Sequence, residues 1–527
     1  MGITGNWDGR ISRRTLLRTG GSAAAGLVMF GRSALAARAA PPFAAEPFTL
    51  GVASGDPTPD GIVLWTRLAP EPLADGGGMP PEVYGMRYEL AADDKFTRIV
   101  RRGGVEALPE EVHTVHVDVR GLEPATEYWY RFKWGTAVSP VGRTRTAPAA
   151  DAAPAALDFA FVSCQAYSHG LYPAYADLAR QDLELVVHLG DYIYEGPGLT
   201  GVRRHEPARE IKTLADYRTR YAQYKTDGHL QAAHAAFPWL MTWDDHEFKN
   251  NYADLDLDPN EPLDTVAERR AAAYLAYWEH SPLSRSRKPV GKDMNLYRRL
   301  RWGGLTTFHV LDTRQHRADQ IDACAASERD PSGYCPAALD PSRSILGAEQ
   351  RDWLLDGLGT SGTAWNVLAN QVPFAPWERD PSPDIRRFDR DQWDGYVADR
   401  QLVLDFLAER KLLNAIAITG DSHIHSARNV PRDFRALDGP VIATEFIGSA
   451  ISSDGDPANP TSTFGGDANN PHFQFTNRRK GYVKVLVEPS LWTNEFRVVE
   501  TITDDEAPAW TEATFVVPNG SPGAVRV

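Results

Sequence analysis

The sequence is short of cysteine, of basic residues and of long apolar runs, and each shortage narrows what the chain can be. It has 56 Lys and Arg against 70 Asp and Glu, so its formal net charge is −14 at pH 7. This balance argues against a nucleic-acid-binding platform, because phosphate contacts need a basic face. No apolar run is long enough to span a bilayer, so we expect no transmembrane segment in the mature chain.

The 3 cysteines cannot all pair within one chain. Cys324 and Cys335 are close in the sequence with polar residues between them, so a local disulfide is their natural interpretation. Cys164 is then left alone, directly after an apolar run typical of a strand. In an exported protein such an odd cysteine indicates a free thiol or an intermolecular bond.

The sequence does contain enough apolar residues to form a large folded core. It has 527 residues, of which 42% are hydrophobic and 24% charged, as in an ordinary globular protein. This length exceeds what one hydrophobic core usually organises, so we expect two or more domains.

Residues 1–36 are predicted to be a twin-arginine signal peptide rather than part of the fold. Arg13 and Arg14 precede a short, weakly apolar stretch, and Ala34-Leu35-Ala36 supplies small residues for cleavage. The alternative is a basic amphipathic start of the mature chain. The signal predicts engagement with the twin-arginine export machinery and a secreted, periplasmic or cell-wall-associated location.

Residues 45–146 are predicted to form a fibronectin/Ig-like β-sandwich. Residues 113–119 alternate with period two, and residues 121–130 resemble the tyrosine corner of such sandwiches. The Ala- and Pro-rich stretch at 147–156 is typical of a linker. Residues 491–527 lack a long amphipathic pattern and are interpreted as a C-terminal tail.

Residues 157–490 have the pattern of an α/β domain, because apolar strands alternate with amphipathic helices. A polar cluster follows each of five predicted strands, where α/β folds bind their ligands. A single Asp, His or Tyr in such a place is more often structural, but five clusters in one domain are difficult to explain as helix caps. The clusters are Ser163-Cys164-Gln165, Gly190-Asp191-Tyr192-Ile193-Tyr194-Glu195, Trp243-Asp244-Asp245-His246-Glu247, Asn370-Gln371-Val372-Pro373 and Gly420-Asp421-Ser422-His423.

Together with Leu311-Asp312-Thr313-Arg314 and Asp391-Gln392-Trp393-Asp394-Gly395-Tyr396, these strings resemble the PhoD-like alkaline phosphatase and phospholipase D family of calcineurin-type metallophosphoesterases. The resemblance runs from about residue 47 to 490. It implies a metallophosphoesterase domain of two packed mixed β-sheets flanked by helices, preceded by the β-sandwich.

The resemblance also implies a metal centre with one ferric ion. Asp191 takes the place of the aspartate that bridges two metals, and Tyr194 that of an iron-bound phenolate. Cys164 stands where related phosphatases carry an aspartate, and a thiolate is a soft ligand suited to iron. His423 occupies the remaining position expected for iron.

The second half of the predicted centre has oxygen ligands in place of two histidines of related enzymes. Oxygen-only ligands suit a hard cation, so the resemblance implies one or two calcium ions. The choice between neighbours within Asp244 and Asp245, and within Asn370 and Gln371, stays open. The oxygen ligands are expected from Asp191, Asp244, Asp245, Asn370, Gln371 and Asp421.

Two residues are candidates for catalysis. His246 matches a histidine that contacts the phosphate or protonates the leaving group in similar enzymes; the alternative is a hydrogen bond to a ligand carboxylate. Arg314 could hold a phosphate with its planar fork, or form a structural salt bridge.

The predicted function is hydrolysis of phosphate monoesters or diesters, from small or polymeric substrates, by attack of a metal-activated hydroxide. The chain has no compelling Ser-centred constellation, which fits a mechanism without a protein nucleophile. The alternatives are a phospholipase D or another phosphodiesterase and, from a different class, a non-catalytic cell-wall-binding protein that works through its β-sandwich.

Overall fold

A computed structural model describes residues 46–198, 201–255, 262–380, 386–434, 439–459 and 469–527. The signal peptide predicted at residues 1–36 lies outside these ranges. Within them, no helix has both the length and the apolar character that crossing a bilayer requires.

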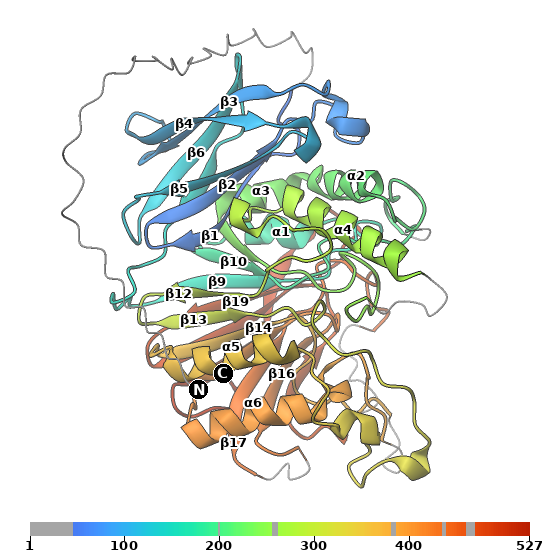
Figure 1. The fold of residues 1–527 in the computed structure, drawn as a ribbon. Helices are drawn as coiled ribbons and strands as arrows, with labels where there is room; N and C mark the ends of the chain where they lie inside the picture. Colours follow the sequence, from blue (N-terminus) through green and yellow to red (C-terminus); the bar gives the residue numbers. More distant parts are fainter. Residues whose placement is uncertain (1–45, 199–200, 256–261, 381–385, 435–438, 460–468) are drawn as a thin grey trace, which may run out of the picture. The chain divides into compact units, whose positions relative to one another are not determined.

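A ten-stranded mixed sheet forms the first of two central layers (Figure 1). Its middle strands β9, β10 and β11 are parallel, and they are buried apolar runs, as expected for strands covered on both faces. Along the sheet the strands are β22 (Val525–Arg526), β21 (Ala509–Pro518), β20 (Leu491–Val499), β19 (Gly481–Val487), β9 (Leu157–Val162), β10 (Leu185–His188), β11 (Pro238–Met241), β1 (Val52–Thr58), β2 (Gly61–Arg67) and β5 (Thr114–Arg120).

A seven-stranded sheet forms the second central layer. Strands β13, β14, β15 and β17 are parallel neighbours, and antiparallel strands flank them. Apolar side chains of the two sheets, among them Phe159 and Phe308, meet in a shared buried core. Its strands are β12 (Arg298–Trp302), β13 (Thr306–Val310), β14 (Trp365–Asn370), β15 (Ala415–Thr419), β17 (Val441–Ile447), β16 (His425–Pro431) and β18 (Phe473–Asn477).

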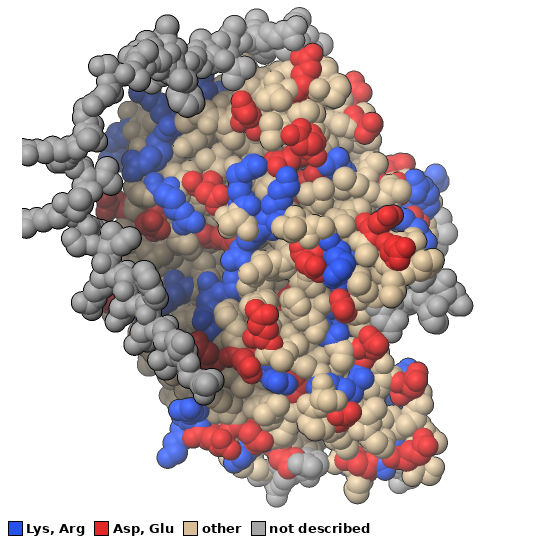
Figure 2. Space-filling view, viewed as in Figure 1, with Lys and Arg blue, Asp and Glu red and all other residues tan. Residues whose placement is uncertain are grey.

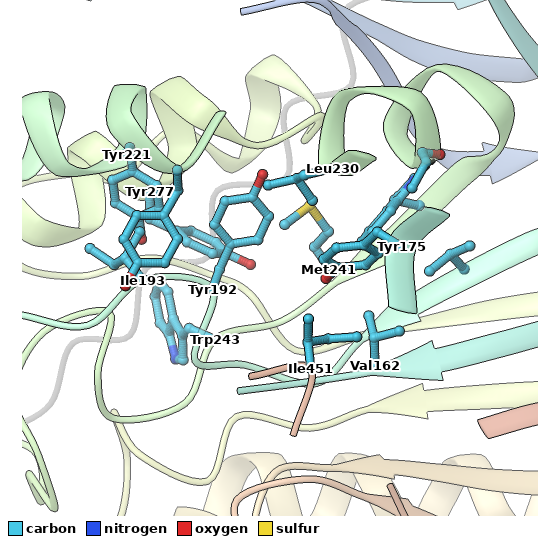
Figure 3. Close-up of a cluster of buried hydrophobic side chains, with 14 of the residues drawn as sticks. Val162, Tyr175, Tyr192, Ile193, Tyr221, Leu230, Met241, Trp243, Tyr277 and Ile451 are labelled. Atoms are coloured by element: carbon cyan, nitrogen blue, oxygen red, sulfur yellow. Dashed lines mark hydrogen bonds between the residues drawn. The ribbon is translucent and has the colours of Figure 1, made fainter. Parts of the chain in front are cut away.

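Helices cover the outer faces of both sheets (Figure 1). On the ten-stranded sheet the contact is rich in aromatic rings: Tyr221 of α2 and Tyr277 of α4 lie over Tyr192 and Trp243 (Figure 3). These helices are α1 (Pro173–Leu178), α2 (Leu214–Lys225), α3 (Gly228–Ala236) and α4 (Leu263–His280), whereas α5 (Gly347–Thr360) and α6 (Val397–Arg410) cover the seven-stranded sheet.

The predicted N-terminal sandwich is present, but it is not a separate body. Its second sheet packs on β1, β2 and β5, and the Tyr128 hydroxyl accepts a hydrogen bond from the Glu123 amide at 3.0 Å, as in a tyrosine corner. However, β1 pairs in parallel with β11, so one sheet of the sandwich continues into the α/β domain. The second sheet contains β3 (Tyr84–Ala91), β4 (Ile99–Ala107), β6 (Glu127–Trp134), β7 (Ala137–Val138) and β8 (Gly142–Arg145).

The prediction of a C-terminal tail over residues 491–527 is wrong. These residues form β20, β21 and β22, which pair in sequence and extend the ten-stranded sheet beyond β19. Buried and partly buried residues alternate along β20, which is the period of a strand and leaves no helical amphipathic pattern. The predicted disulfide between Cys324 and Cys335 is confirmed, and Cys164 is free and buried.

Candidate metal centre

The predicted ligands lie in the turns that directly follow parallel strands. Cys164 follows β9, Asp191 follows β10, and Asp421 and His423 follow β15. All four have left-handed backbone conformations, with φ of 58°, 57°, 59° and 56°. Such conformations cost about 1–3 kcal/mol each for residues with a side chain, and they persist at functional sites where the surrounding structure enforces them.

The strand ends are fixed to one another by close backbone packing. Gly190 has φ of 112°, and a Cβ at this position would lie 2.4 Å from the Cβ of Asp244, so only glycine fits. The carboxylate of Glu247 accepts hydrogen bonds from the amides of Asp191, Tyr192 and Asp244 at 3.0, 2.6 and 2.9 Å. Glu247 therefore ties the end of β10 to the end of β11.

Four predicted ligands meet on one side of the centre, which we call the soft side: Cys164, Asp191, Tyr194 and His423. One ligand atom each of Cys164, Asp191 and His423 lie within 4.8 Å of one another. The Tyr194 hydroxyl donates to Asp191 Oδ2 at 2.9 Å and lies 3.3 Å from His423 Nε2. A thiol, a carboxylate, a phenol and an imidazole thus surround one small space.

The ring of His423 is oriented by a residue that the sequence did not reveal. His423 Nδ1 lies 2.7 Å from Asp454 Oδ2, and this hydrogen bond helps to lower the pKa of Asp454. An imidazole that donates from Nδ1 to a carboxylate presents Nε2 as a basic ligand atom. Burial lowers the pKa of His423, which favours the neutral form that binds metals.

Carboxylates form the other side of the centre, which we call the carboxylate side: Asp244, Asp245, Asp391 and Asp421 around Arg314. Ligand atoms of Asp191, Asp245 and His246 lie within 4.8 Å of one another, so Asp191 belongs to both groups. Asp245 Oδ2 accepts a hydrogen bond from the Asn251 amide at 2.6 Å. Asp421 Oδ2 accepts one from Gln392 at 2.8 Å.

Burial disfavours the charged forms of these acids, but Arg314 and other neighbouring groups together outweigh burial at Asp245 and Asp391 and lower the pKa of both. At the other three acids burial prevails. It raises the pKa of Asp191 and of Asp421 well above the usual range, and it raises that of Asp244 to about 6 although Arg314 opposes the shift. Asp244 Oδ2 is buried and has no hydrogen-bond donor among the described residues. Cations bound here would supply the missing positive charge, so the donor set fits a cluster of metal ions.

Comparison with known proteins agrees with this geometry. The family model for the PhoD-like phosphatase matches residues 159–496, and the model for the N-terminal domain of PhoD-like phosphatases matches residues 34–148. The chain belongs to the PhoD-like phosphatase family. The predicted family and fold class are thereby confirmed.

Two relatives show how far the similarity extends. Alkaline phosphatase D of Bacillus subtilis (strain 168) is 47% identical over 496 residues, covering 93% of this chain and 84% of the relative. A solved structure described as "Structure of PhoD" is 46% identical with a TM-score of 0.87, and the match covers 93% of each chain. This member of the PhoD-like phosphatase family therefore shares the whole two-part architecture with its relatives.

The prediction that Arg314 holds the substrate phosphate is not supported in this PhoD-like chain. Its guanidinium is completely buried; it contacts Asp244 at 2.5 Å and both oxygens of Asp391 at 2.8 Å, and lies 3.8 Å from Asp245. The alternative, a structural salt bridge, is closer to the finding. However, Arg314 pairs with the acids of the centre itself and compensates part of their charge.

The predicted amide ligands Asn370 and Gln371 are engaged elsewhere. Gln371 Oε1 accepts from the amide and hydroxyl of Thr313 at 3.1 and 2.8 Å, so both lone pairs of this oxygen are used. Asn370 Oδ1 accepts from the indole of Trp393 at 3.1 Å. The sequence placed both amides at a strand end, but it could not show in which direction their side chains point.

His246 lies beside the centre, as predicted, with a partner that the sequence analysis did not assign. His246 Nδ1 is 2.6 Å from Glu195 Oε2, and its ring stacks on that of Tyr194 with centroids 4.1 Å apart. Burial alone would lower the pKa of His246, but Glu195, Asp245 and Asp191 together raise it well above its usual value. Glu195 and Glu247 stand within the recognised strings, without a signal that marks their partners, whereas Asp454 lies 31 residues beyond His423.

Proposed function

We propose that this PhoD-like phosphatase hydrolyses phosphate esters at a centre that holds Fe³⁺ on its soft side and Ca²⁺ on its carboxylate side. The activity is that named for its relative alkaline phosphatase D. The observation that carries the proposal is the convergence of Cys164, Asp191 and His423 within 4.8 Å beside the Tyr194 hydroxyl. A thiolate and a phenolate favour iron, whereas carboxylates favour a hard cation.

The ligand roles are assigned from these contacts. Asp191 bridges the two sides, because it belongs to both groups of ligand atoms. Asp245 is the better second ligand of the carboxylate side, since Arg314 contacts Asp244 at 2.5 Å and Asp245 only at 3.8 Å. Asp421 joins them, oriented by Gln392. The metal ions, when bound, polarise the phosphoryl oxygens and lower the pKa of water for attack on phosphorus.

The thiol of Cys164 must lose its proton to bind a metal, and a bound cation is what favours that loss. Burial and the neighbouring Asp191 raise its pKa well above the usual range, so the metal-free side chain is a neutral thiol. The same holds for the phenol of Tyr194, whose pKa is raised by burial and then by Asp191. Metal binding on the soft side is therefore coupled to release of protons.

His246 is assigned the proton-transfer role. Glu195 holds its Nδ1 and keeps the ring protonated, so that Nε2–H donates a hydrogen bond to a phosphoryl oxygen or the proton to a departing alkoxide. We call Glu195 and His246 the Glu195–His246 dyad. The His246 ring stacks on Tyr194 of the soft side and lies beside Asp245 of the carboxylate side, so the dyad is near both.

The test combines metal analysis with activity in one variant. Asp191→Ala is expected to lose both metals and to lower phosphatase activity by at least about 1,000-fold, since both sides share this carboxylate. Asp356→Ala, an exposed acid on α5, is the matched control. Normal activity with normal metal content in Asp191→Ala would refute the assignment. Assays with a monoester, a diester and phosphatidylcholine then distinguish phosphatase, phosphodiesterase and phospholipase D activity.

The proposal also includes export by the twin-arginine route. The disulfide between Cys324 and Cys335 fits an oxidising compartment outside the cytoplasm. Replacing Arg13 and Arg14 with Lys is expected to retain the precursor inside the cell. Unchanged export of this variant would refute the route without affecting the proposed chemistry.

A further inference from the structure

A basic pocket lies away from the metal centre, in the part of the molecule where the N-terminal strands meet β12. Its volume is about 360 Å³, and none of its lining residues belongs to the centre. Figure 2 shows Lys and Arg side chains gathered over the region where Figure 1 places β2 and the end of α4. Five arginines line this pocket, which we call the arginine pocket: Arg120, Arg287, Arg298, Arg299 and Arg301.

The lining provides only one acid against these five cations. Asp56 lies at the end of β1 with φ of 46°, and it is bound to Arg298 at 2.7 Å. Arg298 also donates to the carbonyls of Leu296 and Met241 at 3.0 and 2.9 Å, so its donors are used within the fold. Asp56 and Arg298 therefore form a structural pair within the lining of the pocket.

The remaining arginines differ in how far other acids neutralise them. Arg120 lies 3.7 Å from Asp60, and Arg299 lies 3.6 Å from Asp356. The other two retain free donors: Arg287 donates through Nη1 to the carbonyl of Asn295 and lies 3.6 Å from Asp56, and Arg301 donates through Nε to Gly303. Within the described residues, the Nη2 of Arg287 and both η nitrogens of Arg301 have no hydrogen-bond partner.

Guanidinium groups that line one pocket and retain free N–H donors favour an anion that accepts several hydrogen bonds. The pKa of Arg287 is lowered to about 10, mainly by burial and then by the neighbouring Arg298, whereas Asp56 opposes the shift. A tetrahedral dianion offsets two such charges at once and accepts the forked hydrogen bonds that guanidinium offers. The hydroxyls of Ser284 and Ser286, which lie 2.9 Å apart at the rim, add neutral donors.

We propose that the arginine pocket is a second phosphoryl-binding site, in which Arg287 and Arg301 with Arg120 bind a phosphate group without hydrolysing it. The group comes either from free inorganic phosphate or from a phosphodiester further along a polymeric chain. The inference does not depend on the identity of the metals. The strand β11 contributes Leu240 to the pocket and leads to Asp244 and Asp245, so the two sites share one element of the fold.

The test measures phosphate binding to the metal-loaded enzyme and to variants that leave the centre intact. Equilibrium dialysis with labelled inorganic phosphate is expected to show two sites, and the pocket site is expected to weaken at least about tenfold in R287Q/R301Q. Because Arg287 is partly buried, R120Q/R301Q, which changes two exposed arginines, repeats the test without that risk to folding. R87Q/R102Q removes two exposed arginines of β3 and β4 and is the matched control.

Two probes separate the sources of the phosphate group. If inorganic phosphate loses its second site in both pocket variants, the pocket takes free phosphate. If only a six-unit phosphodiester oligomer binds more weakly, the pocket holds the chain of a polymeric substrate. In either case the inhibition constant of phosphate against a small monoester stays unchanged. Unchanged binding of both probes in both pocket variants, or an equal loss in R87Q/R102Q, would overturn the proposal.

Discussion

The two sides of the metal centre differ in how the negative charge of their ligands is compensated. On the soft side, Cys164 and Tyr194 are neutral without a metal, and the pKa of each is raised mainly by burial. On the carboxylate side, Arg314 is already present and contacts Asp244 and Asp391 at 2.5 and 2.8 Å. The comparison indicates that the soft side depends on its metal for charge, whereas the carboxylate side is partly compensated by the protein itself.

Removing Arg314 should have the largest effect, because it takes away the cation that compensates the carboxylate side. Arg314→Met leaves Asp244 and Asp391 buried without their cation, which destabilises a protein by about 3–5 kcal/mol. We expect a large fall in the urea midpoint of the chelated protein. Arg317→Met is the control, since Arg317 contacts only Asp391 among these acids. Equal stability of the Arg314 and Arg317 variants would show that Arg314 does not compensate the cluster.

Changing Cys164 should affect the soft side alone. Cys164→Ser replaces the soft ligand by a hydroxyl, so we expect loss of iron, retained calcium and activity lower by about 100-fold. Elemental analysis of the purified variant measures iron and calcium separately, and Asp356→Ala, the exposed acid on α5, serves as the control. Joint loss of iron and calcium would mean that the two sides are not independent.

Gln371 tests which residues bind calcium. Gln371→Met removes hydrogen bonds to Thr313, Thr242 and the carbonyl of Leu311, which should lower the free energy of unfolding by about 2 kcal/mol. Calcium content should stay unchanged, because Gln371 Oε1 is not free to bind it. By contrast, Asp421→Asn should lower calcium content. A calcium deficit in Gln371→Met would show that Gln371 is a calcium ligand.

Changing the Glu195–His246 dyad should have the smallest effect on activity, together with a change in how stability depends on pH. The folded pKa of His246 is raised, so its pairing stabilises the chelated protein fully below its unfolded pKa of about 6.5, and this stability is lost as the pH rises through the folded pKa. Glu195→Gln should remove that slope from urea unfolding above about pH 6.5 and reduce activity about tenfold. An unchanged slope would exclude the dyad as its source.

The sequence alone was sufficient to predict those parts of the fold in which a local pattern of residues recurs. Buried strands followed by polar turns predicted the α/β domain, and the soft-side residues Cys164, Asp191, Tyr194 and His423 do lie together. Such turns are local, so a string of neighbouring residues determines them. The strand β20 also follows a local period, but it is the period of a strand and not of an amphipathic helix.

What the sequence could not give are contacts between distant segments and side-chain directions. Asp454 lies 31 residues from His423, and Asp391 lies 77 residues from Arg314, so nothing local connects these partners. The side chain of Gln371 points to Thr313 and Thr242 for reasons of packing. Arg120, Arg287 and Arg301 line one pocket only because the end of β5, the turn after α4 and β12 lie together in the fold.

The most direct test of the central claim is the X-ray absorption spectrum at the iron edge of the enzyme purified from its export route. The account predicts one sulfur ligand at iron in the wild-type protein and none in Cys164→Ser. An iron-containing, active enzyme with only oxygen and nitrogen ligands at the metal would contradict the account.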